Sequence, residues 1–260
     1  MTIPFVSVLG RVTLGLFQLI GSMAMFAGQG LWRIFTPPYY PRLIGRQMME
    51  IGYGSLPVVG LTAVFTGMVL ALQSHTGFAR FAAEGAIPQL VVVSITRELG
   101  PVLAGLMVAG RVSAAMAAEL GTMRVTDQID ALRTLSTNAF SYLIAPRFLA
   151  AIICMPLLVV VADTIGVFGG YLVSTTKLGF SPDLYLKNTV SFVTSIDIVS
   201  GLVKAAVFGF IIALMGCYQG YVCSGGARGV GRATRNAVVT AAITILASNY
   251  VLTEIFFSVS

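Results

Sequence analysis

The fold class is decided at residues 51–72, where the chain reads IGYGSLPVVGLTAVFTGMVLAL without a single charged residue. An apolar run of roughly 18 residues or more with few charges is typical of a transmembrane helix. The glycines and the proline do not argue against a helix, because neighbouring helices in a membrane bundle can satisfy the backbone groups that such residues free. The stretch therefore predicts a membrane-spanning helix.

Four further apolar runs follow, at residues 86–118, 148–173, 198–222 and 237–259. Of the 260 residues, 57% are hydrophobic and 10% are charged, and the mean hydropathy is +0.90. Soluble domains carry about 25% charged residues, so the composition does not fit an ordinary soluble protein. The sequence predicts an all-α integral membrane protein with five spanning helices.

The N-terminal stretch at residues 12–32 is also uncharged, but it contains Gln18 and Gln29 and lies between Arg11 and Arg33. It is long enough to span a membrane, and it is equally compatible with a helix that lies in the membrane interface. It lacks a small-residue cleavage site after a short apolar core, so we do not expect a removed signal peptide.

Basic residues are distributed unevenly over the connecting segments. With the N-terminal region on the inner side, the inner side receives eleven arginines, which are Arg11, Arg33, Arg42, Arg46, Arg111, Arg124, Arg133, Arg147, Arg228, Arg232 and Arg235. The outer side receives three basic residues, which are Arg80, Lys177 and Lys187. This bias follows the positive-inside rule and predicts an outer C-terminus. It also explains the net charge of +6 without nucleic acid, since no one-faced basic patch is evident.

The sequence shows no constellation for catalysis or metal binding. His75 has no Cys, His or carboxylate at ligand spacing. Cys154, Cys217 and Cys223 form no CxxC pattern, so neither a disulfide nor a zinc site is predicted. No GxSxG string or positioned histidine indicates a hydrolase.

The glycine-rich segment at residues 224–236 reads SGGARGVGRATRN. It lacks the GxxxxGK(S/T) pattern of a phosphate-binding loop, and no strand precedes it. We interpret it as an inner loop whose Arg228, Arg232 and Arg235 meet anionic lipid headgroups.

The string RELGP, which begins at Arg97, places two charges inside the second apolar run, roughly 15 Å from its start at 1.5 Å per residue. Charges at such a depth are costly and normally face a cavity or each other. Because neighbours in sequence do not face each other on a helix, Arg97 and Glu98 should each have a further partner. That partner belongs either to a structural pair beside a proline kink or to a transport cavity. Asp163 and Lys204 pair between helices or serve a proton relay, and Glu254 lies near an outer helix end.

The longest inner segment, at residues 119–146, contains an amphipathic stretch. Thr126 is placed to cap a helix with Asp127 and Asp130 in its first turn. An apolar stripe with helical spacing is formed by Val125, Ile129 and Leu132. The stretch is either a surface helix that covers the spans or a docking helix for a cytoplasmic partner.

Several strings resemble one known family. They are GMVLALQ (67–73), TRELGPVLAGLMVAGRVSAAMAAELGTMRVTDQIDAL (96–132), APRFLA (145–150) and GVGRATRNAVV (229–239). These strings closely resemble the MlaE/YrbE permease family, and the central one is long and specific. The N-terminal forty residues match only in general character.

The resemblance implies a single MlaE-type permease domain over residues 1–260, with an N-terminal interfacial region at 1–47 and a five-span transmembrane domain at 48–260. A cytoplasmic coupling helix would lie between the second and third spans. The implied function is that of a non-catalytic permease subunit of an ABC transporter in the bacterial inner membrane. It would move glycerophospholipids between inner and outer membranes and so maintain outer-membrane lipid asymmetry.

The partners that the resemblance implies are a second copy of the chain, a cytoplasmic ABC ATPase, a periplasmic MCE-domain protein and often a small STAS-domain protein. ATP and Mg would be bound by the ATPase, and no cofactor is expected in this chain.

The resemblance also assigns site residues. The wall of the lipid cavity would include Leu70, Gln73, Arg97 and Glu98. Contact with the ATPase would involve Glu119, Gly121, Arg124, Asp127, Gln128 and Asp130. His75 and Arg80 differ from the family at the outer rim of the cavity.

An ion-coupled secondary transporter and a lipid-modifying enzyme are the alternative classes of function. An ion-coupled secondary transporter would explain the intramembrane charges, but such folds often contain inverted repeats, and none is evident. A lipid-modifying enzyme would need a metal or nucleophile cluster, which the sequence does not show.

Overall fold

The computed structural model describes residues 4–79 and 84–258, and every regular element within these ranges is a helix. The predicted all-α class is therefore confirmed for the described part of the chain. Arg80 and Val259, which ends the fifth predicted run, lie outside the described residues.

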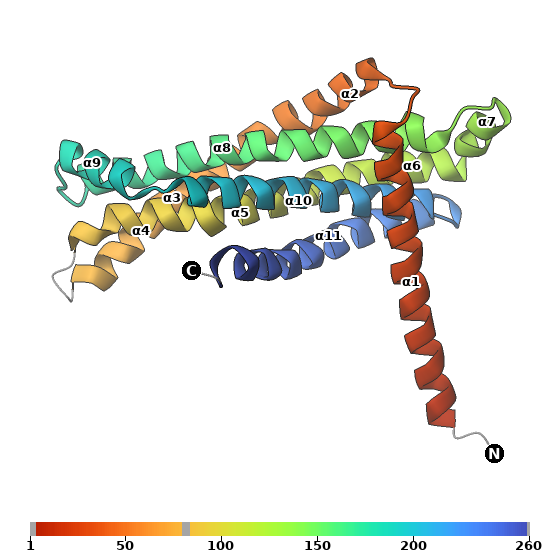
Figure 1. Cartoon of the computed structure of the whole chain (residues 1–260), viewed down its shortest axis with the longest axis horizontal. Coiled ribbons are helices and arrows are strands. Elements are labelled where there is room, and N and C mark those ends of the chain that lie inside the picture. Colours follow the sequence, from red (N-terminus) through yellow and green to blue (C-terminus); the bar gives the residue numbers. More distant parts are fainter. Residues whose placement is uncertain (1–3, 80–83, 259–260) are drawn as a thin grey trace.

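Five long helices run side by side in an elongated bundle (Figure 1). They are Pro41–Phe78, Ile87–Val125, Phe140–Thr176, Ser195–Tyr221 and Gly226–Phe257, called spanning helices 1 to 5 below. Each is long and apolar enough to cross a membrane. Nearly all of each predicted run lies within one of these helices, so the five predicted spans are confirmed.

Three of the spanning helices contain π-helical turns. Spanning helix 1 consists of α2 (Pro41–Met48), the turn η1 (Met49–Tyr53) and α3 (Gly54–Phe78). Spanning helix 2 consists of α4 (Ile87–Ser94), η4 (Ile95–Leu99), α5 (Gly100–Val108), η5 (Ala109–Ser113) and α6 (Ala114–Val125). Spanning helix 3 consists of η6 (Phe140–Ile144) and α8 (Ala145–Thr176). Such turns are frequent at functional sites, and η4 holds the RELGP charges.

The remaining elements connect or flank the bundle. They are α1 (Pro4–Phe35), η3 (Glu84–Ala86), α7 (Gln128–Thr134) and α9 (Pro182–Phe192). Spanning helices 4 and 5 are each one uninterrupted helix, α10 (Ser195–Tyr221) and α11 (Gly226–Phe257). Short α7 lies at one end of the bundle and α9 at the other (Figure 1). By the charge bias, the α7 end is the inner one.

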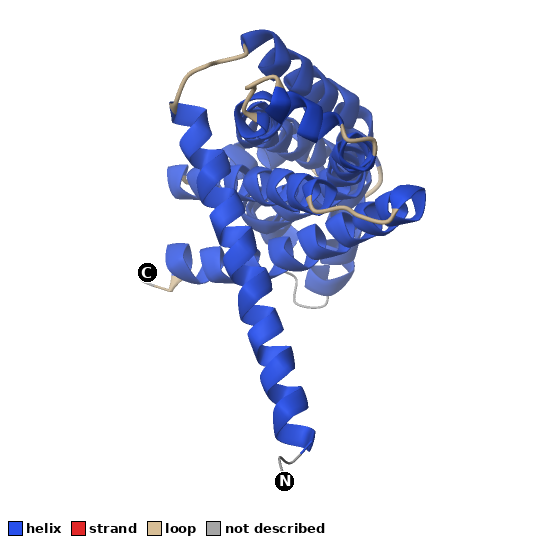
Figure 2. Ribbon diagram, turned by 90° about the vertical axis from the view of Figure 1, so that its right-hand side faces the viewer, coloured by secondary structure: helices blue, strands red, loops and turns tan. Residues whose placement is uncertain are grey.

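Helix α1 crosses the bundle instead of joining it (Figures 1 and 2). It meets the inner end through Phe26, whose ring centroid lies 5.2 Å from that of Phe140 and 5.5 Å from that of Tyr218. The Ser22 and Tyr218 hydroxyl oxygens are 2.7 Å apart. Length and composition would let α1 span a membrane, but a helix across five spanning helices runs along the membrane plane, which favours the interface.

Glycines let spanning helices 1 and 3 approach closely. A Cβ atom at Gly67 would overlap the carbonyl group of Gly166, and one at Gly169 would overlap the carbonyl of Val64. Small residues at such crossings are typical of helix packing in membranes. The two helices are therefore held backbone to backbone.

The glycine-rich segment at residues 224–236 is not a loop, so that prediction is wrong. Gly225 and Gly226 have φ of 90° and 62°, which turns the chain sharply, and α11 begins at Gly226. Gly229 lies under the carbonyl of Ser224, where a Cβ atom would overlap it. The glycines serve one tight turn, after which the segment is helical.

The predicted cap at Thr126 is also wrong. The Thr126 hydroxyl donates to the carbonyl of Thr122 at 2.8 Å, and α7 begins after Asp127, whose φ is 59°. The hydroxyl therefore bonds back to the preceding turn instead of to α7. The apolar stripe is confirmed, since Ile129 is fully buried and Val125 and Leu132 are partly buried.

Candidate functional site

The RELGP string forms the centre of a polar network in the outer half of the bundle. Pro101 has no N–H group to donate to the carbonyl of Arg97, four residues earlier. That carbonyl instead accepts a hydrogen bond from Lys204 Nζ of α10 at 3.0 Å. The proline therefore opens a backbone acceptor to the neighbouring helix.

Lys204 is fully buried, and its ammonium group has three partners. Besides the Arg97 carbonyl, Nζ donates to Glu98 Oε1 at 2.7 Å and to Thr253 Oγ1 at 2.8 Å. An ammonium has three hydrogens to donate, so this set satisfies it. A buried charge is tolerated when it is paired and fully hydrogen-bonded.

Glu98 connects this lysine to α11. Its Oε2 accepts from Asn249 Nδ2 at 2.9 Å, and its Oε1 accepts from the Thr253 hydroxyl at 2.9 Å. Asn249 and Thr253 are four residues apart, so they lie on the same face of the helix. The Glu98 side chain is 36% exposed, whereas Lys204 behind it has no exposed surface.

Arg97 forms the second ion pair. Its Nε donates to Asp197 Oδ1 at 2.5 Å, and its guanidinium carbon lies 4.5 Å from the ring centroid of Phe257. Asp197 Oδ2 accepts from the backbone N–H of Thr194 at 3.0 Å and from its hydroxyl at 2.8 Å, which caps α10. The same carboxylate thus fixes the start of α10 and holds Arg97.

The network joins spanning helices 2, 4 and 5 through two acidic and two basic side chains, so its formal charge cancels. The prediction that Arg97 and Glu98 each have a further partner is confirmed. The suggested pairing of Asp163 with Lys204 is wrong, because Lys204 pairs with Glu98. Asp163 lies against Gly100 instead, and its Oδ1 has no hydrogen-bond partner among the described residues.

Three members of this network, Asp197, Asn249 and Thr253, are not predicted from the sequence. Asp197 directly precedes the fourth predicted run, and its spacing from Thr194 is that of a capping box. Asn249 and Thr253 are polar residues one helical turn apart in the fifth run. Both patterns could have been recognised from the sequence.

Leu70 and Gln73 lie on α3, apart from this network. Leu70 packs against a buried cluster that includes Ala71, Ile87 and Ile95, and Gln73 is exposed. Within the described ranges, no hydrogen bond or ion pair joins either residue to Arg97 or Glu98. One copy of the chain therefore does not bring the four predicted cavity residues into a single site.

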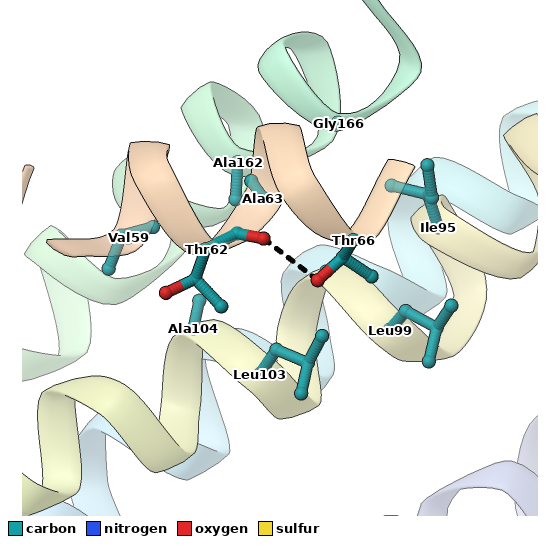
Figure 3. Close-up of a pocket in the computed structure, with 11 residues that line it drawn as sticks. Val59, Thr62, Ala63, Thr66, Ile95, Leu99, Leu103, Ala104, Ala162 and Gly166 are labelled. Carbon is teal, nitrogen blue, oxygen red and sulfur yellow. Dashed lines mark hydrogen bonds between the residues drawn. The ribbon is translucent and has the colours of Figure 1, made fainter. Parts of the chain in front are cut away.

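A small apolar cleft lies between α3, spanning helix 2 and α8 (Figure 3). It is lined by Val59, Thr62, Ala63, Thr66, Ile95, Leu99, Gly100, Leu103, Ala104, Ala162 and Gly166. The Thr66 hydroxyl donates to the carbonyl of Thr62 at 2.8 Å, within its own helix. The cavity volume is about 10 Å³, far below the roughly 300–1,000 Å³ of sites that enclose a drug-sized ligand.

The predicted coupling residues gather at the inner end of the bundle. Arg124 Nη1 donates to both carboxylate oxygens of Asp130, at 2.8 and 2.9 Å, and so braces the α6–α7 corner. Asp127 and Gln128 are exposed at that corner. The exposed pair is therefore available to a partner.

The two remaining coupling residues, Glu119 and Gly121, contact other helices of the same chain. Glu119 pairs with Arg147 of α8 at 2.7 Å. A Cβ atom at Gly121 would lie 3.5 Å from Val230 and 3.6 Å from Cys223, so Gly121 packs against spanning helix 5. Gly121 is buried, whereas the Glu119 side chain is 51% exposed beside its ion pair.

Comparison with known proteins decides the family. The family model described as Permease MlaE matches residues 44–255. The chain belongs to the MlaE permease family. A probable ABC transporter permease protein of Rickettsia bellii is 57% identical over 96% of this chain and 97% of its own length.

Two more distant relatives of this MlaE-family permease are similar over most of the chain. The intermembrane phospholipid transport system permease protein MlaE of Haemophilus influenzae is 34% identical over 99% of both chains. The protein TRIGALACTOSYLDIACYLGLYCEROL 1, chloroplastic, of Arabidopsis thaliana is 36% identical over 91% of this chain and 67% of its own length. The chain is thus an ABC transporter permease and a multi-pass membrane protein, and an ATPase partner follows from that class.

Proposed function

We propose that this MlaE-family permease moves glycerophospholipids between the inner and outer membranes of a bacterial envelope. The chain would lie in the inner membrane, and ATP and Mg²⁺ would be bound by a separate ABC ATPase. The Haemophilus relative, named as an intermembrane phospholipid transport permease and matched over nearly its full length, supports this substrate. Family membership favours this function over an ion-coupled secondary transporter.

The observation that carries the proposal is the polar network around Arg97 and Glu98, which is partly exposed and lies beside apolar helix surface. Arg97 and Glu98 are each 36% exposed, whereas Asp197 and Lys204 behind them are buried. An outward-facing acid and base at this depth are costly against lipid tails alone. A zwitterionic or anionic headgroup would supply the complementary charges.

The acyl chains require a different surface, which α3 supplies. Val69 is 62% exposed and Leu72 is 39% exposed, and the exposed amide of Gln73 follows them. These apolar side chains would contact the tails, with Gln73 closer to the headgroup.

A second copy of the chain would complete the cavity. The cleft of about 10 Å³ in one copy is too small to enclose a two-tailed lipid, and Leu70 and Gln73 lie apart from Arg97 and Glu98. A homodimer would place α3 of one copy opposite the network of the other. It would also cover part of the exposed charge.

The inner end of the bundle would dock the ATPase through the α6–α7 corner, where Asp127 and Gln128 are exposed and Leu135 is 75% exposed. Arg228, Arg232 and Arg235 form an exposed face of α11 near the same end, where anionic headgroups would bind. A periplasmic MCE-domain protein and a STAS-domain protein complete the proposed assembly.

The first experiment is affinity purification of the tagged chain from native membranes in mild detergent, followed by mass spectrometry. Stoichiometric recovery of a P-loop ATPase and an MCE-domain protein with bound phospholipid supports the proposal. Recovery of the chain alone, while other membrane complexes stay whole, contradicts it.

The site assignment is tested separately in proteoliposomes of phosphatidylethanolamine and phosphatidylglycerol. Arg97→Ala and Glu98→Ala should each lower lipid transfer and lipid-stimulated ATP hydrolysis in the assembled complex. Unchanged activity in both variants would show that the network is structural. Transfer that depends on a membrane potential instead of ATP would support the ion-coupled alternative.

A further inference from the structure

Arg147 is a buried arginine at the inner end of the bundle that the proposed lipid site does not use. It lies in the first turn of α8, and its side chain is 5% exposed. Its Nη1 donates to the carbonyl of Leu143 at 2.5 Å, and its Nη2 donates to Glu119 Oε2 at 2.7 Å. Burying a guanidinium is costly unless it is paired, so this position depends on Glu119.

The Glu119–Arg147 pair connects two helices that are otherwise not joined by polar contacts. Over residues 4–79 and 84–258, no other hydrogen bond or ion pair links α6 to α8. Glu119 lies on α6, which runs on to Val125 and the α6–α7 corner. Any displacement of that corner moves the Glu119 carboxylate relative to α8.

Arg147 is well placed to receive such a displacement. Its second anchor, the Leu143 carbonyl, belongs to the π-helical turn η6 immediately before α8. The guanidinium therefore holds the start of α8 with one nitrogen and α6 with the other. Because the fork of an arginine is planar and rigid, a pull on one nitrogen reorients the whole group.

Helix α8 packs closely against α3. Gly67 meets the carbonyl group of Gly166, and Gly169 meets that of Val64, at distances that leave no room for a Cβ atom. Backbone surfaces packed this closely cannot slide past one another without separating. Motion of α8 therefore reaches α3, which holds Leu70 and Gln73.

We propose that the Glu119–Arg147 ion pair is a strut that passes displacement of the α6–α7 corner to α8 and α3. Spanning helix 2 carries the same displacement directly to Arg97 and Glu98. The strut connects the corner separately to α3, which forms the opposite wall of the cavity. Arg147 is a positioning residue and touches neither lipid nor nucleotide. The inference rests on the proposed function, because it assumes that the ATPase moves the corner.

The strut is tested in the complete transporter complex with the variants Arg147→Met, Glu119→Gln and the exchange Glu119→Arg/Arg147→Glu. A bimane fluorophore on Thr76→Cys, an exposed position of α3 outside the proposed lipid site, reports the surroundings of α3, since Cys154, Cys217 and Cys223 are buried. The bimane emission is recorded with and without a non-hydrolysable ATP analogue. Lipid transferred per ATP hydrolysed is measured in the same proteoliposomes of phosphatidylethanolamine and phosphatidylglycerol.

In the labelled complex without any of these substitutions, the ATP analogue should shift the bimane emission. Arg147→Met and Glu119→Gln should each abolish that shift and lower the lipid transferred per ATP by roughly fivefold or more, as expected when two sites lose their coupling. The exchange should restore both readouts in part, which a purely structural role of either residue would not produce. Arg46→Met is the matched control, because Arg46 is exposed at the inner end and forms no ion pair in the described part of the chain.

Three outcomes overturn the strut. They are a normal emission shift and transfer ratio in Glu119→Gln, an exchange variant no better than the single changes, or an equal loss in Arg46→Met. If Arg147→Met does not assemble, Glu119→Gln decides, since that side chain is 51% exposed and its amide retains the shape of the carboxylate. Failure of the proposed function is seen differently, as an unaltered complex that moves no lipid on ATP addition.

Discussion

Lys204 Nζ lies 2.7 Å from Glu98 Oε1, and the lysine side chain has no surface exposed to solvent or lipid. The Glu98 side chain of this pair faces outward, and 36% of it is exposed. A buried base thus holds a half-exposed acid in place. Lys204 comes from α10 and Glu98 from η4, so the pair also fixes how two spanning helices meet.

Removing the buried base should destabilise the protein. Lys204→Met leaves Glu98, Thr253 and the Arg97 carbonyl without their shared donor, and because Glu98 is 36% exposed the cost should lie below the about 3–5 kcal/mol of breaking a fully buried pair. The double change Lys204→Met/Glu98→Gln removes both charges and should lose less. Reversible unfolding in mixed micelles measures both. A double variant less stable than Lys204→Met would contradict the pairing.

Asp197 should show two separable effects. Asp197→Asn keeps a side-chain oxygen for the Thr194 N–H but loses the charge that pairs with Arg97, whereas Asp197→Ala loses both. We therefore expect Asp197→Ala to be less stable than Asp197→Asn by about 1 kcal/mol, the usual net contribution of one hydrogen bond. The same unfolding assay measures the difference. Equal stability would mean that the cap contributes nothing in this bundle.

The sequence predicts the spans well because each is a long apolar run, and length and hydropathy are local properties. It also predicts that Arg97 and Glu98 need partners, since buried charges must be compensated. It cannot say which partners they find, because that depends on how spanning helices 2, 4 and 5 are rotated against each other. Lys204 was therefore matched with Asp163, although it pairs with Glu98.

The two wrong local predictions have a common physical origin. Glycines at residues 225–231 suggested a loop, yet Gly225 and Gly226 supply the positive φ of one turn, and Gly229, already in α11, allows the close approach of the Ser224 carbonyl. Thr126 suggested a cap, yet its hydroxyl found a nearer acceptor in the preceding turn at Thr122. Local composition indicates which conformations and hydrogen bonds a residue favours. Tertiary packing and competing backbone acceptors decide which of them it adopts.

Close packing at Gly67 predicts a clear contrast between two glycines of α3. Gly67→Ala would place a Cβ atom into the carbonyl group of Gly166, and overpacking of this kind costs about 1–3 kcal/mol. Gly77→Ala is the control, because nothing lies within 4 Å of its Cβ position. It should stabilise the helix by about 0.4–1 kcal/mol. Both changes destabilising alike would show that α3 and α8 are not packed as described.

The exposed arginines of α11 predict a preference for anionic lipid near the inner end. Arg228, Arg232 and Arg235 recur at helical spacing and are all exposed, so together they present one basic face. Arg228→Gln/Arg232→Gln/Arg235→Gln should lower the enrichment of phosphatidylglycerol around the purified protein by about fivefold or more, since each basic residue near an anionic surface adds to its attraction.

Native mass spectrometry of the protein in mixed nanodiscs measures this enrichment, with phosphatidylcholine as the neutral competitor. The matched control is Lys177→Gln/Lys187→Gln, which removes exposed basic residues at the opposite end of the bundle. Because the attraction is electrostatic and exposed to solvent, the difference between triple variant and parent should shrink as salt is raised. Equal enrichment in the triple variant and its parent at low salt would assign these arginines to a protein partner instead of lipid.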